Sequence, residues 1–127
     1  MSMIPCPSES QEQQTLMRWA ELQSRAHPEL QLLFHIPNEG LRHPATGRRM
    51  IAEGMKSGVP DLMLPVPRGG YHGLFIEMKR QHGGHVSDEQ RGWITCLRGQ
   101  GYRAEVCKGA EAAIDVIEEY LNGRGEK

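Results

Sequence analysis

A chain of 127 residues with 38% hydrophobic and 24% charged residues can bury the core of one domain, but not of two. It has no run of the roughly 18 apolar residues that a membrane-spanning helix needs, which excludes that class of protein. The three cysteines show no metal-ligand spacing and the first residues do not resemble a secretory signal, so we expect reduced thiols in a cytoplasmic protein.

The net charge of −1 hides an uneven distribution of charge along the chain. Residues 40–103 contain ten basic and five acidic residues, whereas the segments on either side are both acidic. This basic middle suits a local phosphate-binding surface, although a solvated mixture of charges would give the same counts.

We expect eight regular elements in the order α-β-α-β-β-α-β-α, which predicts an α/β fold with a mixed β-sheet flanked by helices. Hydrophobic periodicity, caps and turn residues predict helices over Gln11–Ala26, Gly47–Lys56, Ser87–Gly99 and Gly109–Leu121, and strands over Leu30–Ile36, Gly58–Val66, 72–79 and Tyr102–Cys107.

The chain is expected to form a single domain over residues 1–127, with loose tails at 1–7 and 122–127. Ser8 is expected to cap the first helix. The inward-facing residues of that helix are predicted to be Leu16, Trp19, Ala20 and Leu22.

Two strands near the centre of the sequence carry charged residues beside apolar ones. In the strand over 72–79, the even-numbered side chains from 74 to 78 share one face, and Glu77 and Lys79 share the other. Asp61 lies near the start of the preceding strand. Because buried charges must be paired or bound to a metal, Asp61 and Glu77 predict a divalent-metal site with Lys79 beside it. Such a site suits the hydrolysis of phosphodiester bonds.

The arrangement of these residues resembles the VRR-NUC (virus-type replication-repair nuclease) family of the PD-(D/E)xK nuclease superfamily, in particular its small stand-alone phage-type members. The resemblance covers nearly the whole chain and rests on a series of motifs in register. These are Ser8-Glu9 with Gln13, Ile36-Pro37-Asn38 with Arg42, Gly54 with Gly58-Val59-Pro60-Asp61-Leu62, Phe75-Ile76-Glu77-Met78-Lys79, Ser87 with Gln90 and Trp93, and Gly101-Tyr102.

The resemblance implies a restriction-endonuclease-like core and a role for each matching residue. Asp61 and Glu77 would hold Mg²⁺ or Mn²⁺, with the backbone carbonyl of Met78 as a further ligand. Lys79 would orient the attacking water and offset charge on the phosphate. Glu9 matches the acidic position on the first helix, although Glu12 could serve instead, and either could be an ordinary acid at a helix start.

Gln90 and Trp93 of the third predicted helix have two possible roles each. Ser87 and Gln90 form a capping box, yet the resemblance implies that Gln90 reaches back towards the site. Trp93 is expected in the core, because Ile94 and Leu97 continue its face, with a base-stacking platform as the alternative.

Candidate DNA-binding residues come from the basic middle of the chain. His72, His82 and His85 lack the spacing of a zinc site, and the loop over 80–86 is expected to contact phosphate instead. The basic candidates are Arg42, Arg48, Arg49, Lys56 and Arg80, and their alternative is simple exposure to solvent.

The function expected from these features is that of a metal-dependent, structure-selective DNA endonuclease, acting on branched or four-way junction DNA in replication or repair. The alternative is a non-catalytic nucleic-acid-binding protein that retains the nuclease fold. We also expect a homodimer, since a four-way junction needs two symmetric incisions. Its candidate interface is the aliphatic surface of the last helix, formed by Ala112, Ala113, Ile114, Val116, Ile117 and Leu121.

Overall fold

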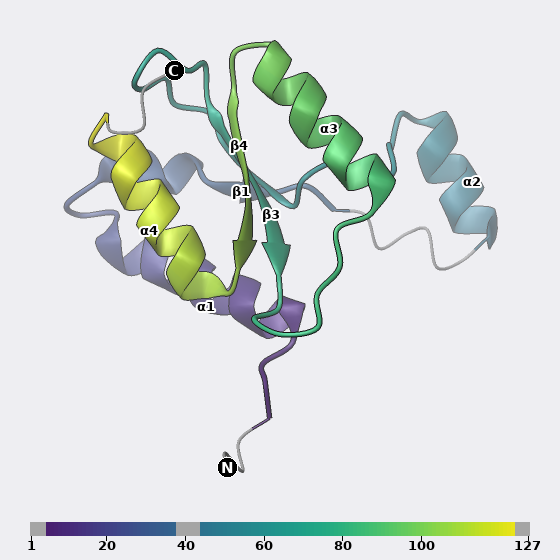
Figure 1. Ribbon diagram of the computed structural model, residues 1–127, viewed down its shortest axis with the longest axis horizontal. Coiled ribbons are helices and arrows are strands. Elements are labelled where there is room, and N and C mark those ends of the chain that lie inside the picture. The colour runs from purple at the N-terminus through teal and green to yellow at the C-terminus, as the bar shows by residue number, and fades with distance from the viewer. Residues whose placement is uncertain (1–4, 38–43, 124–127) are drawn as a thin grey trace.

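The computed structural model describes residues 5–37 and 44–123 (Figure 1). Its element order confirms the predicted succession of helices and strands, with one additional 3₁₀-helix. The elements are α1 (Glu9–Gln23), η1 (Pro28–Leu32), β1 (Phe34–His35), α2 (Pro44–Ala52), β2 (Leu62–Leu64), β3 (Leu74–Lys79), α3 (Asp88–Gly99), β4 (Arg103–Lys108) and α4 (Ala110–Leu121).

The four strands form one mixed sheet in the order β1-β2-β3-β4. β2 runs antiparallel to both β1 and β3, and β4 runs parallel to β3, as a crossover through α3 requires. In this register Leu62 lies opposite Ile76, and Glu77 lies beside Val106. β2 therefore pairs only with residues 74–76, whereas the charged end of β3, from Glu77 to Lys79, pairs with β4 alone.

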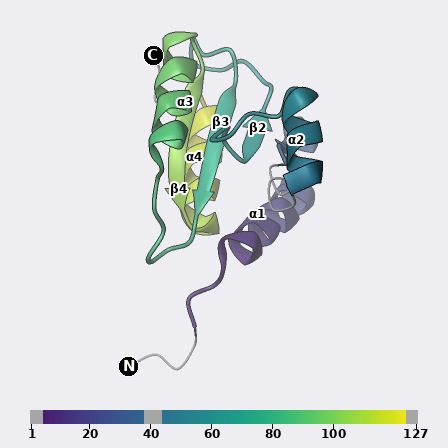
Figure 2. The same cartoon turned by 90° about the vertical axis from the view of Figure 1, so that its right-hand side faces the viewer.

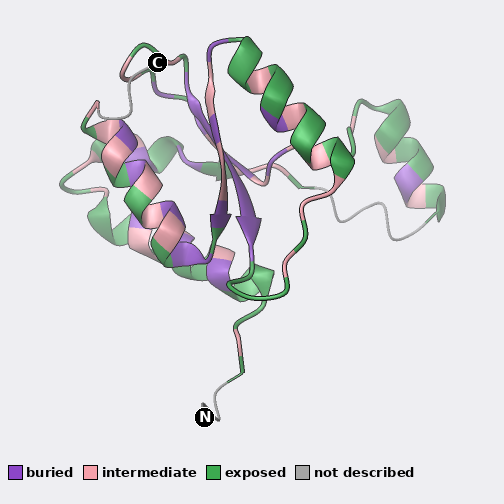
Figure 3. Ribbon diagram, viewed as in Figure 1, coloured by how far each residue is buried: buried purple, intermediate pink, exposed green. Residues whose placement is uncertain are grey.

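Helices cover both faces of the sheet. α1 and α4 pack on one face and α3 packs on the other (Figure 1). The larger core lies under α1 and α4 and includes Leu16, Ile76 and Ile117, whereas the smaller one joins Phe75 and Ala104 to Ile94 of α3. All six residues of β3 are buried, including the two charged ones (Figure 3). The predicted alternation of β3 is confirmed, and both of its faces are covered.

Capping boxes set the starts of α1 and α3. The amide of Gln11 donates to Ser8 Oγ at 3.1 Å, and the amide of Ser8 donates to Gln11 Oε1 at 2.8 Å. Ser87 and Gln90 make the same reciprocal pair at α3. Because these pairs satisfy amides that the helix leaves free, they fix where each helix begins. The predicted caps are confirmed.

The segment predicted as a strand over Leu30–Ile36 begins within a 3₁₀-helix. Pro28 starts a 3₁₀-helix, and only two residues afterwards, Phe34 and His35, pair with β2. Leu30 and Leu33 are buried three residues apart, which matches one turn of a 3₁₀-helix rather than the alternation of a strand. This prediction was wrong for most of its length.

The inward face of α1 is also narrower than predicted. Leu16 and Ala20 are buried and Trp19 is half-buried, but Leu22 is 77% exposed. Leu22 lies two residues beyond Ala20, about 200° around the helix, and therefore points away from the core.

α2 begins and ends earlier than the predicted range of Gly47–Lys56. It lies at the edge of the molecule (Figures 1 and 2), and most of its residues are exposed. No helix among the described residues is long and apolar enough to cross a membrane.

The aliphatic surface of α4 serves the protein's own core. Ala113 and Ile117 are fully buried, and the other four members of the proposed interface are partly buried against the same cluster. Two stripes of α4 are needed because the helix packs against α1 as well as against the sheet. The apparent surplus of aliphatic residues therefore does not indicate a dimer interface.

Candidate metal and catalytic centre

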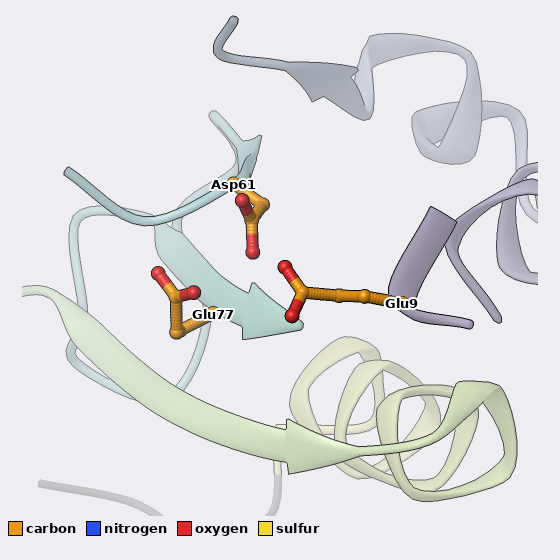
Figure 4. Close-up of side chains that lie close together, drawn as sticks. All are labelled: Glu9, Asp61 and Glu77. Atoms are coloured by element: carbon orange, nitrogen blue, oxygen red, sulfur yellow. The ribbon is translucent and has the colours of Figure 1, made fainter. Parts of the chain in front are cut away.

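Three carboxylates from distant parts of the sequence meet at one point (Figure 4). Glu9 extends from the first turn of α1, Asp61 from the residue before β2, and Glu77 from β3. One oxygen atom of each lies within 4.8 Å of the others. We call these three residues the carboxylate cluster. It is the only group of three or more Asp, Glu, His or Cys side chains with such spacing in residues 5–37 and 44–123.

A glycine turn and the backbone of β3 hold Asp61 in place. Gly58 has a φ of 88°, and a Cβ atom there would lie 2.7 Å from Cβ of Glu89. Any side chain at position 58 would therefore push the turn before Asp61 away from α3. The Asp61 carboxylate also accepts a hydrogen bond of 2.7 Å from the amide of Met78. The glycine and the β3 backbone together fix one side of the cluster.

Glu77 is the buried member of the cluster, with 2% of its side chain exposed. Its Oε2 atom accepts a hydrogen bond of 3.1 Å from Gln90, whereas its Oε1 atom is buried and has no hydrogen-bond partner. Burial, together with the neighbouring charge of Asp61, raises the pKa of Glu77 to about 8. Burial and the charge of Asp61 also raise the pKa of Glu9.

Lys79 and Gln90 complete the enclosed side of the site. Lys79 is 6% exposed, and its Nζ atom lies 3.6 Å from Glu77 Oε2. The ammonium group also donates a hydrogen bond of 2.9 Å to Gln90 Oε1. Since that oxygen accepts from the Ser87 amide as well, Gln90 both caps α3 and joins Lys79 to Glu77. Gln90 therefore forms the capping box and also reaches the site, so its two predicted roles are compatible.

This arrangement fits a hard divalent cation. Mg²⁺ and Mn²⁺ prefer carboxylate oxygens, and the cluster supplies three. The unpartnered Oε1 atom of Glu77 and the raised pKa values of Glu77 and Glu9 both reflect negative groups without enough positive charge nearby. A bound cation would supply that charge.

Glu12, the alternative acid of the first helix, lies outside the cluster. It is 5% exposed and its carboxylate accepts hydrogen bonds from the Ala110 amide and from Gln81. The geometry therefore separates the two acids, with Glu9 facing the cluster and Glu12 facing the start of α4.

His35 and Gln13 are further neighbours of the site. Gln13 belongs to the motifs on which the resemblance rests, although no role was assigned to it, whereas His35 was not singled out. His35 Nδ1 lies 2.9 Å from the backbone oxygen of Asp61 and 3.1 Å from Gln13 Nε2. Gln13 follows Glu9 by one helical turn, so the two share a face of α1. The motif of Glu9 and Gln13 was thus visible in the sequence, whereas the position of His35 depends on the pairing of β1 with β2.

The basic candidates lie at the surface. Arg48 and Arg49 of α2 are exposed, as are Lys56 and Arg80, and Arg42 lies outside the described residues. Within the described chain, no ion pair involves any of these four exposed side chains. They are available for contacts with phosphate.

Trp93 lies outside both cores, contrary to the prediction. Its indole nitrogen donates a hydrogen bond of 3.0 Å to the backbone oxygen of Ser57, and the residue lines a surface hollow of about 340 Å³ with Gly92 and Cys96. Ile94, one residue further along, is the side chain that enters the core.

His72 packs edge-on against the ring of Tyr102 instead of approaching the other histidines.

Comparisons with known proteins agree with this geometry. The model of the VRR-NUC domain family matches residues 7–111, a range that contains the carboxylate cluster, Lys79 and Gln90. A solved structure described as a VRR_NUC domain protein is 30% identical in sequence and superposes with a TM-score of 0.81. The similarity covers 96% of this chain and 93% of that one. No curated protein gives a significant match.

Proposed function

Because the chain belongs to the VRR-NUC domain family and has a nuclease-family fold, we propose that it is a metal-dependent endonuclease that hydrolyses phosphodiester bonds in DNA. The observation that carries this proposal is the carboxylate cluster with the buried Lys79 beside it. Glu77 and Lys79 are buried, Asp61 is half-buried and Glu9 is exposed. The two buried charges have little value as fold elements, because burying them costs free energy. They are well suited to binding a cation and a phosphate together.

Asp61, Glu77 and Glu9 are the residues that would hold Mg²⁺ or Mn²⁺, with the backbone carbonyl of Met78 as a further ligand. The ion supplies Lewis-acid chemistry, making water more acidic and withdrawing electron density from the phosphoryl oxygen. The protein's own contribution is to fix these ligands on three separate elements, so that little reorganisation is needed when substrate binds.

Lys79 is proposed to orient the attacking water and to offset charge that develops on the phosphate. Its ammonium group is held by Gln90 and lies close to Glu77, which keeps it directed towards the cluster. Gln90 is a positioning residue in this scheme, because it acts through Lys79 and Glu77. No covalent intermediate is required, since water is the nucleophile.

The proposed substrate is branched or otherwise structured DNA, such as a four-way junction. The described residues build little besides the sheet and its covering helices, which leaves few elements for reading base sequence. The exposed basic residues at the surface would contact phosphates, and such contacts carry no sequence information. We therefore propose structure-selective cutting, in a replication or repair process.

A panel of labelled substrates tests this function. The protein is incubated with Mg²⁺ or Mn²⁺ and with linear, flap, splayed and four-way DNA, and Glu77→Gln serves as the matched inactive variant. We expect metal-dependent cleavage of the branched substrates by the wild type alone. Binding of DNA without cleavage under all metal conditions would instead favour a non-catalytic nucleic-acid-binding protein.

The active unit is proposed to be a homodimer, because two symmetric incisions resolve a junction. Because the aliphatic surface of α4 packs in the protein's own core, the candidates for interface residues are the exposed large hydrophobic residues Leu22, Leu32, Phe34 and Ile51. Light scattering at micromolar concentration measures the stoichiometry. A stable monomer that cuts junctions at full rate would refute the dimer.

A further inference from the structure

Glu12 is a buried carboxylate that the proposed chemistry does not use. Only 5% of the residue is exposed, and its two oxygens have different partners. Oε1 accepts a hydrogen bond of 3.0 Å from the backbone amide of Ala110, and Oε2 accepts one of 2.9 Å from the side-chain amide of Gln81. These residues are 98 and 69 positions away along the chain, so Glu12 links α1 to two remote segments.

The start of α4 needs this carboxylate because it has no cap of its own. Its N-cap residue is Gly109, which has no side chain to accept a hydrogen bond. Gly109 has a φ of 95°, donates its amide to the carbonyl of Lys79 at 2.8 Å, and packs so closely that a Cβ atom would lie 2.9 Å from Gln81 Cγ. Glu12 therefore supplies from α1 an acceptor for the free amide of Ala110, at the helix end that favours negative charge.

The position of Glu12 connects this cap to the catalytic centre. It lies one turn after Glu9, and residues three apart share a helix face. Gln81, its second partner, lies two residues after Lys79 at the exit of β3. We propose that Glu12 is a positioning residue that ties α1 to the junction of β3 and α4 and thereby keeps Glu9 within the carboxylate cluster. The metal-related part of this inference rests on the proposed function.

A double-mutant cycle tests the inference. Calorimetry measures Mn²⁺ binding to the metal-free protein, without DNA, for the wild type, Glu12→Ala, Glu9→Gln and the double variant. We expect Glu12→Ala to weaken binding about tenfold, the size typical of residues that orient metal ligands. In the Glu9→Gln background the same change should have no further effect, because the residue that it positions no longer carries a charge.

Two further variants separate positioning from general stability. Glu12→Gln retains an oxygen that can accept from the Ala110 amide, so it should restore most of the lost affinity. Glu21→Ala removes an exposed acid from the same helix and should leave Mn²⁺ binding unchanged. If Glu12→Ala does not fold, Gln81→Ala weakens the same link through one hydrogen bond and takes its place in the cycle.

Thermal unfolding in EDTA provides a readout that needs no metal. In the wild-type background, Glu9→Gln removes one of the like charges in the carboxylate cluster and should raise the Tm. In the Glu12→Ala background, the same change should raise the Tm less. Wild-type protein that binds no Mn²⁺ would refute the proposed function, while the Tm cycle would still decide the positioning role. A folded Glu12→Ala with wild-type Mn²⁺ affinity, or an unchanged Tm gain in both backgrounds, would overturn the inference.

Discussion

Replacing Glu77 by glutamine should remove a pH dependence of stability from the metal-free protein. The side chain is buried, and desolvation together with the charge of Asp61 raises its pKa from 4.5 to about 8. In the unfolded chain the same carboxyl has its ordinary pKa. Folding near neutral pH therefore requires Glu77 to take up a proton, and glutamine removes that requirement while keeping the shape of the side chain.

The sign of the effect follows from the order of the two pKa values. Below about pH 4.5 the carboxyl is neutral in both states, so the folded protein bears no penalty. As pH rises towards 8, the unfolded chain ionises while the folded one keeps its proton, and the free energy of unfolding falls. Each pKa unit corresponds to about 1.4 kcal/mol, so the total fall has an upper limit of about 5 kcal/mol.

Urea unfolding in EDTA at several pH values between about 5 and 9 measures this effect. Every other ionisable group is present in both proteins, so the difference between wild type and Glu77→Gln reports on the Glu77 carboxyl. We expect the wild type to lose stability relative to the variant as pH rises, and to regain it when Mg²⁺ or Mn²⁺ is added at pH 8. Parallel curves for the two proteins would refute the assignment of a raised pKa to Glu77.

Three further predictions concern cleavage and binding. Asp61→Asn and Lys79→Met should each abolish cleavage while circular dichroism shows a folded protein, and the double variant should be little worse than either single one, because the two residues act as a unit. Ca²⁺ should support DNA binding but not cleavage, since its looser coordination activates water poorly, and equal cleavage in Ca²⁺ and Mg²⁺ would contradict this. Charge reversal at Arg48 and Arg49 should weaken DNA binding for all sequences and reduce its dependence on salt, and an unchanged slope across a salt series would mean that both merely face solvent.

The features predicted correctly from sequence are those determined by nearby residues. The alternation of β3 follows from the side-chain geometry of any strand, and it correctly places Glu77 and Lys79 on one face. The cap at Ser8 and the capping box of Ser87 and Gln90 depend on residues three positions apart, and both form as expected. Local rules of this kind need no knowledge of the rest of the fold.

Two questions of side-chain placement depend on partners that are remote in sequence. Trp93 continues an apolar face of α3, but its indole is held by the carbonyl of Ser57, 36 residues away. The choice between Glu9 and Glu12 could not be made from helix periodicity, because the two lie on the same face. It depends on the start of α4, which only the folded chain brings near Glu12.

Gln90 offers a way to separate a helix cap from a catalytic contact within one side chain. Its Oε1 atom accepts from the Ser87 amide and from Lys79, and its Nε2 atom donates to Glu77. The Gln90→Glu variant would retain the acceptor and hence the capping box, but its carboxylate could not donate to Glu77 and would add a negative charge beside it. Ser87→Ala removes the opposite half of the pair and leaves the side chain of Gln90 in contact with the site.

The two variants should therefore differ in what they change. We expect Ser87→Ala to cost about 1 kcal/mol of stability with little change in kcat, since it removes a cap. With Mg²⁺ bound, Gln90→Glu should keep near-wild-type stability and lose about 10- to 100-fold in kcat, since it disturbs a residue that orients the site. Urea unfolding in Mg²⁺ and single-turnover cleavage of a branched substrate measure the two quantities. If kcat fell equally in both variants, the cap itself would be the source of the effect, and the contacts of Gln90 with Lys79 and Glu77 would have no separate role in catalysis.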